Sequence, residues 1–255
     1  MTTKTIVIVG ENLLAKELFN MFQDIGLYQV FHHYFTNNQI DVVIETTNLD
    51  LNEKKRNLQE MEAVISSNTL ILSSSLQITA TETASWLQHP NRLIGFGTFS
   101  NFKDRDLIEV ALPLQADSSY LQSAKEVFSS IGQEIEQVED EVGLVYPRIL
   151  AMIINEAAFA LMEQTATADA IDEAMKKGTN YPFGPFEWAE KIGLDDVYAV
   201  LTGLHREIGE ERYRPAPLIK KLVYAGWVGG DTNKCFYHYQ NRKVRSFQNE
   251  RSGHY

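Results

Sequence analysis

Short apolar runs alternate with longer segments of helical pattern over the first 138 residues, and this alternation constrains the fold more than any other feature of the sequence. Each run is short enough to be a strand buried on both faces, and the segments between them are long enough for crossover helices. This pattern is typical of a parallel α/β sheet. Strands are expected at Thr5–Val9, Tyr28–His33, Val42–Glu45, Thr69–Ser73, Leu93–Phe96, Ile108–Pro113 and Glu134–Val138, with helices at Leu13–Ile25 and Ser118–Ile131.

The pattern changes after Glu141. Apolar residues three and four positions apart run through Arg148–Gln164, which predicts a helix with a buried face. Thr167 and Gly178 are typical caps for a helix over Ala168–Lys176. Further helices are expected at Pro185–Ile192, Asp195–Ile208 and Pro217–Ala225. The chain is therefore expected to form a shortened Rossmann-like parallel sheet domain (1–141), an all-helical C-terminal domain (142–240) and a polar tail (241–255).

Charge is unevenly distributed along the 255 residues. The chain carries 23 Lys and Arg against 34 Asp and Glu, and this net charge of -11 opposes general binding to nucleic acid or to an anionic membrane. Residues 212–255, however, hold nine basic and two acidic side chains. This basic end is the region where an anionic ligand should be tested first.

Cysteine and hydropathy patterns bear on the compartment. The single cysteine, Cys235, excludes an intrachain disulfide and suits a reducing environment. The first apolar run, Ile6–Val9, is too short for a signal peptide, and no apolar run reaches the about 18 residues of a membrane span. A soluble cytoplasmic protein without a metal site is expected.

A degenerate dinucleotide-binding turn follows the first expected strand. In the pattern G-x-G-x-x-G/A, Gly10 supplies the tight turn and Ala15 permits close helix packing, but Asn12 replaces the glycine that lets the backbone approach a pyrophosphate. Glu11 adds a negative charge beside the same position, and no Asp or Glu occurs between Ile25 and Ile40 to bind a ribose. The turn is therefore either a weakened cofactor site, with Gly10, Asn12 and Ala15 as its residues, or a connection that binds nothing.

From Asp41 onward, a series of motifs resembles one known family. The segments are DVVIETTNLDLNEKKRNL (41–58), LSSSLQIT (72–79), NRLIGFGTFSNF (91–102), LIEVALP (107–113), IDEAMKKGTNYPFGPFEWAEKIGLD (171–195) and RYRPAPLIKKLVYAGWVGG (212–230), followed by FYHY (236–239). They resemble the NAD-dependent 3-hydroxyacyl-CoA dehydrogenases, and the resemblance spans residues 5–240.

This resemblance implies a Rossmann domain followed by a helical domain that forms a homodimer, with NAD as cofactor and an acyl-CoA as substrate. The chain is shorter than the family between Tyr34 and Asp41, where the family carries a further helix and strand. The cofactor-side edge of the sheet is therefore expected to be truncated.

The resemblance also implies that the catalytic histidine is missing. In the family a histidine takes the hydroxyl proton during hydride transfer and a glutamate orients it; the histidine position aligns with Gly97, whereas the glutamate is retained as Glu109. Without its histidine, Glu109 is expected to face water, to find a new cation or to have a raised pKa. Ser74 and Ser100 align with family site residues, Ser100 in place of an asparagine. Pro147 replaces another asparagine and offers no side-chain hydrogen bond.

Glu45 and Lys54 match a pair of family residues near the nicotinamide and the substrate. The alternative interpretation is that each is a capping residue or a surface charge.

Three hypotheses remain open. The first is an atypical dehydrogenase in which Glu109 or a water replaces the base. The second is a dimeric binding or regulatory protein that has lost catalysis. The third is a protein that binds a CoA thioester without oxidising it, through the basic residues Arg212, Arg214, Lys220, Lys221 and Lys234, which otherwise form a solvated surface.

Overall fold

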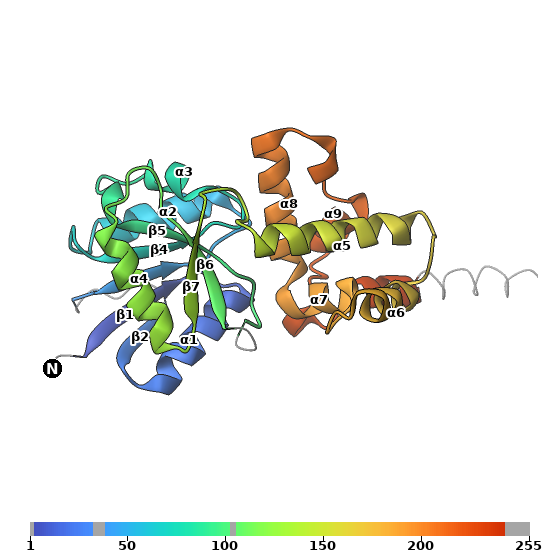
Figure 1. Cartoon of the computed structure of the whole chain (residues 1–255), viewed down its shortest axis with the longest axis horizontal. Helices are drawn as coiled ribbons and strands as arrows, with labels where there is room; N and C mark the ends of the chain where they lie inside the picture. The colour runs from blue at the N-terminus through green and yellow to red at the C-terminus, as the bar shows by residue number, and fades with distance from the viewer. Residues whose placement is uncertain (1–2, 33–38, 103–105, 243–255) are drawn as a thin grey trace, which may run out of the picture.

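The fold consists of a sheet domain and a helical domain that lie side by side (Figure 1). The computed structural model describes residues 3–32, 39–102 and 106–242. In these ranges the sheet has seven strands in the order β2-β1-β3-β4-β5-β6-β7. The strands are β1 (Lys4–Val9), β2 (Tyr28–His32), β3 (Val42–Glu45), β4 (Leu70–Ser74), β5 (Leu93–Gly97), β6 (Leu107–Ala111) and β7 (Glu134–Val138).

The first five strands are parallel, as the alternation predicts. The last two differ: β6 pairs antiparallel with β5, and β7 pairs parallel with β6. The antiparallel register places Gly97 directly opposite Glu109. Two residues that the family resemblance singles out therefore face each other across neighbouring strands.

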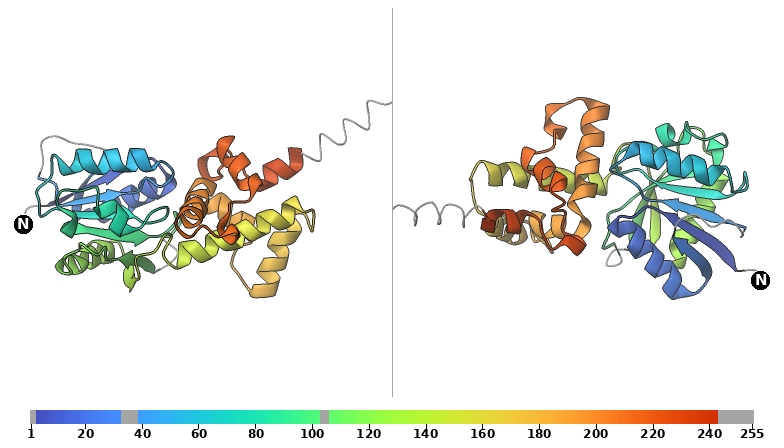
Figure 2. Two further views of the ribbon diagram at one scale, coloured as in Figure 1. Left: turned by 90° about the horizontal axis from the view of Figure 1, so that it is seen from above. Right: turned by 180° about the vertical axis from the view of Figure 1, so that it is seen from behind.

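Helices cover both faces of the sheet, which explains why its strands are apolar on both sides. Ile6 and Ile8 of β1 pack in one core with α1 and α4, whereas Val7 and Val9 pack in another with α2 and α3. Figure 2 shows α2 and α4 on opposite sides of the sheet. The helices are α1 (Leu13–Ile25), α2 (Leu51–Glu62), α3 (Ala80–Ala84) and α4 (Ser119–Ser130).

The helical domain is built around α5, which packs against α7, α8 and α9. Its helices are α5 (Tyr146–Met162), α6 (Ala168–Thr179), α7 (Pro185–Ile192), α8 (Leu194–Ile208) and α9 (Pro217–Tyr224), with 3-10 turns at Glu211–Tyr213 and Gly230–Thr232; a further 3-10 turn, Pro90–Arg92, lies in the sheet domain before β5. Thr167 caps α6 as expected, but Gly178 lies inside that helix, and Asn180 ends it in the left-handed conformation. The prediction of Gly178 as the cap is therefore wrong, because asparagine also tolerates that backbone conformation. No helix in the described ranges is long and apolar enough to cross a membrane.

The sheet begins at β2, which pairs only with β1 within the described residues. The chain passes from β2 to β3 through residues 33–41, of which 33–38 lie outside the described residues. Because β1 has β2 on one side and β3 on the other, the carboxyl ends of β1 and β3 form the switch point of the sheet, where open α/β sheets bind ligands.

Candidate functional site

The turn after β1 lies very close to the end of β3. Gly10 has a φ of 126°, and a β-carbon built there would be 2.2 Å from Thr46 Oγ1. Only glycine fits this conformation and this space. Ala15 is fully buried in the core between α1 and the sheet, so both residues meet the packing requirements of a dinucleotide-binding turn.

Asn12 occupies the N-terminus of α1. Its Oδ1 accepts a hydrogen bond from the backbone N–H of Ala15 at 3.0 Å, and its Nδ2 donates to the carbonyl oxygen of Thr46 at 2.8 Å. The same Nδ2 lies 3.3 Å from a carboxyl oxygen of Asp196 in α8. A residue that the sequence identifies as an obstacle to a pyrophosphate therefore also links the sheet domain to the helical domain.

Asp196 is the central residue of this contact, and sequence reasoning missed it. Only 3% of it is exposed, and it also accepts a hydrogen bond from Asn48 Nδ2 at 2.9 Å. Burial, with repulsion from neighbouring Asp195, raises the pKa of Asp196 to about 8 against the opposing hydrogen bonds. The only sequence signal was the pair Asp195 and Asp196 at the start of a predicted helix. Such a pair does not indicate a domain contact, because acidic residues are common at helix N-termini, where they interact favourably with the helix dipole.

Glu45 and Lys54 lie together, as the family resemblance implies. Both side chains are fully buried, and Lys54 Nζ donates to Glu45 Oε2 and to the Thr47 carbonyl oxygen, the latter at 3.1 Å. Glu45 also accepts from the Thr47 N–H at 2.7 Å and from the Ser73 hydroxyl at 3.2 Å. The pair is therefore satisfied within the protein and is neither a surface charge nor a helix cap.

Gly97, where the family resemblance implies a missing histidine, is packed closely by a neighbour. A β-carbon on Gly97 would lie 2.8 Å from Leu144 Cδ1, so the strand and this buried side chain are in close contact. Leu144 reaches this place because Gly143 and Leu144 have φ values of 73° and 49° before α5 begins. A left-handed leucine is uncommon and strained, so the surrounding structure must hold it there.

Glu109 has a new partner in this arrangement. Its two carboxylate oxygens each accept a backbone hydrogen bond, from Val145 and Tyr146, both at 2.8 Å. Burial raises the pKa of Glu109, and these two bonds act in the opposite direction. Of the three outcomes expected from the sequence, the structure gives a raised pKa, and the partner is the N-terminus of α5 rather than a cation.

The two serines differ in their hydrogen bonds. Ser74 ends β4, and its hydroxyl is buried without a hydrogen-bond partner in the described residues. The Ser100 hydroxyl donates to the carbonyl oxygen of Ile192 at 3.0 Å, at the end of α7. Ser100 therefore helps to join the two domains. Pro147, the remaining position that the family resemblance singles out, is buried in the first turn of α5.

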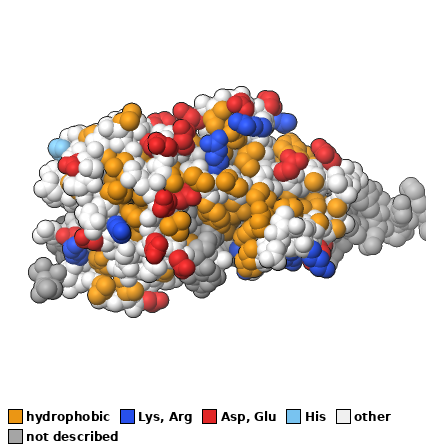
Figure 3. All heavy atoms as spheres, in the orientation of Figure 1, with side chains coloured by type: hydrophobic (Ala, Val, Ile, Leu, Met, Phe, Trp, Pro, Cys, Tyr) orange, Lys and Arg blue, Asp and Glu red, His pale blue; other side chains and the backbone are white. Residues whose placement is uncertain are grey.

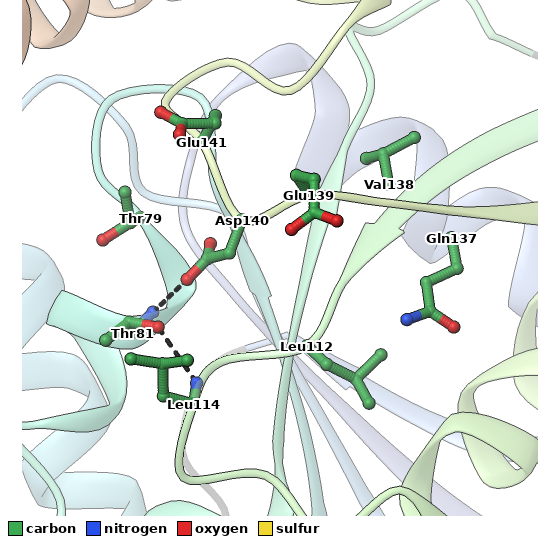
Figure 4. Close-up of a pocket in the computed structure, with 9 residues that line it drawn as sticks. All are labelled: Thr79, Thr81, Leu112, Leu114, Gln137, Val138, Glu139, Asp140 and Glu141. Atoms are coloured by element: carbon green, nitrogen blue, oxygen red, sulfur yellow. Dashed lines mark hydrogen bonds between the residues drawn. The ribbon is translucent and has the colours of Figure 1, made fainter.

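A cleft of about 290 Å³ lies at the switch point. A larger cleft, of about 770 Å³, lies between α3 and the ends of β6 and β7 (Figure 4). Asp140 in this larger cleft accepts the backbone N–H groups of Ala80 and Thr81, each at 2.7 Å, so its charge already holds the start of α3. None of the site residues predicted from the sequence lines it.

Comparisons with known proteins agree with the family resemblance. Residues 16–141 match the 3-hydroxyacyl-CoA dehydrogenase NAD binding domain, and residues 143–239 match the C-terminal domain of the same enzymes. The chain is 34% identical to 3-hydroxybutyryl-CoA dehydrogenase from Bradyrhizobium diazoefficiens over 203 residues, which cover 80% of this chain and 69% of that protein. A probable 3-hydroxybutyryl-CoA dehydrogenase from Bacillus subtilis is 32% identical, over 79% of this chain and 70% of that one.

Solved structures give the same result. The crystal structure of (S)-3-hydroxybutyryl-CoA dehydrogenase from Ralstonia eutropha superposes with a TM-score of 0.71 at 25% identity, over 91% of this chain and 98% of that one. NAD is the cofactor that this family resemblance implies. The chain belongs to the 3-hydroxyacyl-CoA dehydrogenase family.

Proposed function

We propose that this chain has lost the hydride transfer of its family and works as a binding or regulatory homodimer. The observation that carries the proposal is the contact between Gly97 and Leu144. General-base catalysis requires a side chain within hydrogen-bond reach of the substrate proton. Residue 97 offers no side chain, and an apolar neighbour fills the space beside it.

The alternative, an atypical dehydrogenase that uses Glu109 or a water as base, is opposed by the bonding of that carboxylate. Both oxygens of Glu109 accept backbone N–H groups at the start of α5. Using the carboxylate as a base would weaken the N-terminus of the helix around which the second domain is built.

Reduction of acetoacetyl-CoA, followed by NADH absorbance, tests the proposal. An active relative assayed in parallel is the reference. We expect the rate of acetoacetyl-CoA reduction by this chain to be lower than that of the reference by about 10²–10⁴-fold, the usual contribution of a general base. Clear turnover by the wild type that disappears in Glu109→Gln, with the fold retained by circular dichroism, would instead identify an active enzyme with a new base.

The homodimer is proposed on the exposed apolar face of α5. Val145 and Ile149 are 48% and 55% exposed, although Ile149 belongs to the helix that organises the second domain and Val145 directly precedes it. Hydrophobic side chains gather on the same face of the molecule around α5 (Figure 3). An exposed apolar patch of this kind marks an interaction surface.

Sedimentation velocity tests this assembly. The wild type is expected to sediment as a dimer, and Ile149→Glu is expected to shift it to a monomer. Val64→Glu is the matched control, since Val64 is a 45% exposed apolar residue of the sheet domain. A monomeric wild type, or a dimer unaffected by Ile149→Glu, would refute the α5 interface.

Binding of a CoA thioester is a second candidate, favoured by a cleft of about 300 Å³ in the helical domain. Its lining combines two cations with aromatic rings and contains no carboxylate: Lys221, Leu222, Ala225, Trp227, Tyr239 and Arg242. Lys221 Nζ lies 5.8 Å from the Tyr239 ring centre, and Arg242 Cζ lies 5.7 Å from that of Trp227. Such a cleft suits a planar base that carries phosphates.

Other members of the basic end are already paired. Arg212 binds Glu210 at 2.7 Å and Arg214 binds Glu211 at 3.0 Å. Calorimetric titration with acetoacetyl-CoA should therefore show binding that Lys221→Glu abolishes, while its neighbour Lys220→Glu, outside the cleft, leaves it largely intact. Absence of heat with the wild type rejects this candidate.

We also propose a domain division at residues 141 and 142 and a cytoplasmic location. The change from sheet to helices and the separate family matches on either side support the division. The buried, unpaired thiol of Cys235 suits a reducing compartment. Of the polar tail, residues 243–255 lie outside the described residues.

A further inference from the structure

The cleft at the switch point does not fit the cofactor of the family. In dinucleotide-binding folds the pyrophosphate sits at the N-terminus of the first helix, on backbone N–H groups that have no other partner. In this chain the Asn12 side chain takes that place, because its Oδ1 already accepts the Ala15 N–H at 3.0 Å. The donor that should meet a phosphate is therefore in use.

Asn12 is also held from the other domain. Its Nδ2 lies 3.3 Å from one carboxyl oxygen of Asp196, and Asn48 Nδ2 donates to the other at 2.9 Å. Asn12 follows β1, Asn48 follows β3, and Asp196 belongs to the first turn of α8. These three side chains, which we call the domain lock, bridge the switch point and connect both strands to the helical domain.

The charge around the domain lock repels phosphate. Besides Asp196, which its raised pKa keeps neutral, four carboxyl groups and no Lys or Arg are among the residues that line the cleft: Glu11, Asn12, Thr47, Asn48, Leu49, Asp50, Glu53, Asp195 and Asp196. A pyrophosphate is an anion, and like charges at short range in a partly buried site strongly disfavour binding.

The ribose side of the cleft lacks its usual carboxylate. No acidic residue occurs between Ile25 and Ile40 to bind a ribose hydroxyl, and β2 is the edge strand within the described residues. The match to the NAD binding domain starts at residue 16, after the turn from Gly10 to Ala15. The turn that should bind the phosphates, the charge of the cleft and the position that should bind the ribose therefore all differ from those of a dinucleotide-binding site.

We infer that the dinucleotide cleft of this chain has become a fixed contact between its two domains, made by Asn12, Asn48 and Asp196, and that it binds neither NAD nor NADP. This inference goes beyond the proposed loss of catalysis, since a protein without a catalytic base can still bind its cofactor. Asp195, Asn12, Asn48 and Lys54 are the polar groups that act on Asp196. The raised pKa of Asp196 fits a contact in which a neutral carboxyl is buried against two amides.

Titration with NADH, followed by nicotinamide fluorescence and by calorimetry, tests the first half of the inference. We expect no saturable binding up to about 1 mM, that is, a binding free energy weaker than about −4 kcal/mol. Saturable binding at lower concentration overturns the inference. NADH binding without turnover would overturn only this inference, whereas turnover would overturn the proposed loss of catalysis as well.

Hydrogen exchange tests the second half. Asp196→Ala should increase amide exchange at least tenfold in the first turns of both α8 and α1, because the contact between them is removed. Asp24→Ala on the exposed side of α1 is the control and should change neither. If Asp196→Ala does not fold, Asn48→Ala, which removes a donor of the same contact, should show the same direction of change. Unchanged exchange in whichever of these two variants folds overturns the domain lock.

Discussion

The side chain of Leu144 lies against Gly97, so close that a β-carbon on residue 97 would sit 2.8 Å from Leu144 Cδ1. Leu144 is held there by a left-handed turn that leads into α5, and α5 is in turn capped by Glu109, the residue opposite Gly97. The absence of a side chain at residue 97 and the hydrogen bonds of Glu109 are thus parts of one packing arrangement. We therefore expect that a change at residue 97 alone would disturb both.

Gly97→Ala is expected to lower the free energy of unfolding by about 1–3 kcal/mol, the usual effect of overpacking a core. The added methyl group meets the buried side chain of Leu144, which must shift to accommodate it. Denaturant unfolding measures the change, and Leu144→Ala in the same chain should recover part of it. Gly178→Ala is the control: it lies inside α6 with open space around it, and it should stabilise by about 0.5–1 kcal/mol. Equal stabilities of the two glycine variants would contradict the Leu144 contact.

Gly97→His is expected to leave acetoacetyl-CoA reduction more than about tenfold below an ordinary family member. An imidazole needs the space that Leu144 fills, and Glu109 is engaged by Val145 and Tyr146 instead of being free to orient it. The closed switch point removes the hydride carrier as well. The NADH absorbance assay checks this result, and activity within tenfold of a relative would show that the base alone was missing.

Stability should fall as pH rises from about 4 to about 8, through Asp196. Its pKa is raised from 3.8 to about 8, so the folded state keeps a proton that the unfolded state loses. Because the folded pKa is the higher one, the stabilisation is complete below the unfolded pKa and is lost as the pH approaches the folded pKa. Asp196→Asn cannot ionise and should flatten this slope.

Urea unfolding at about pH 5 and about pH 9 measures the difference. The variant should lose less stability than the wild type between these two values, while Asp24→Asn, an exposed carboxylate on α1, should follow the wild type. A wild type whose stability is the same at both values, with its fold intact, would show that Asp196 is already ionised in the neutral range.

The sequence predicts the fold well because the fold depends on local patterns. The two-sided apolar runs of β1, β3 and β4 and the spacing in α5 are visible without any knowledge of contacts. The two reversed strands are less predictable, since β6 and β7 carry the same kind of short run in either direction.

The sequence predicts only those features of the site that depend on the identity of a single residue. The missing side chain at residue 97 and the obstacle at Asn12 can be read directly from the sequence. The contact between Asn12 and Asp196 joins residues 184 positions apart and arises only when the helical domain packs on the sheet. The hydrogen bonds of Glu109 have the same origin, because the backbone N–H groups that donate to it are brought there only when α5 has formed.

The buried pair of Lys54 and Glu45 provides a last prediction, for stability rather than catalysis. Both side chains are fully buried and bound to each other, so removing one leaves an uncompensated charge. Lys54→Met should therefore lower the free energy of unfolding by about 3–5 kcal/mol, and Glu45→Gln in the same chain should recover most of that loss, since no lone charge remains. Neighbouring Lys55, exposed over the Trp86 ring at 5.7 Å, is the control, and Lys55→Met should cost about 1 kcal/mol or less. Denaturant unfolding of the wild type, of Lys54→Met, Glu45→Gln and their double variant, and of Lys55→Met decides the matter: losses that simply add in the double variant would mean that the two charges do not depend on each other.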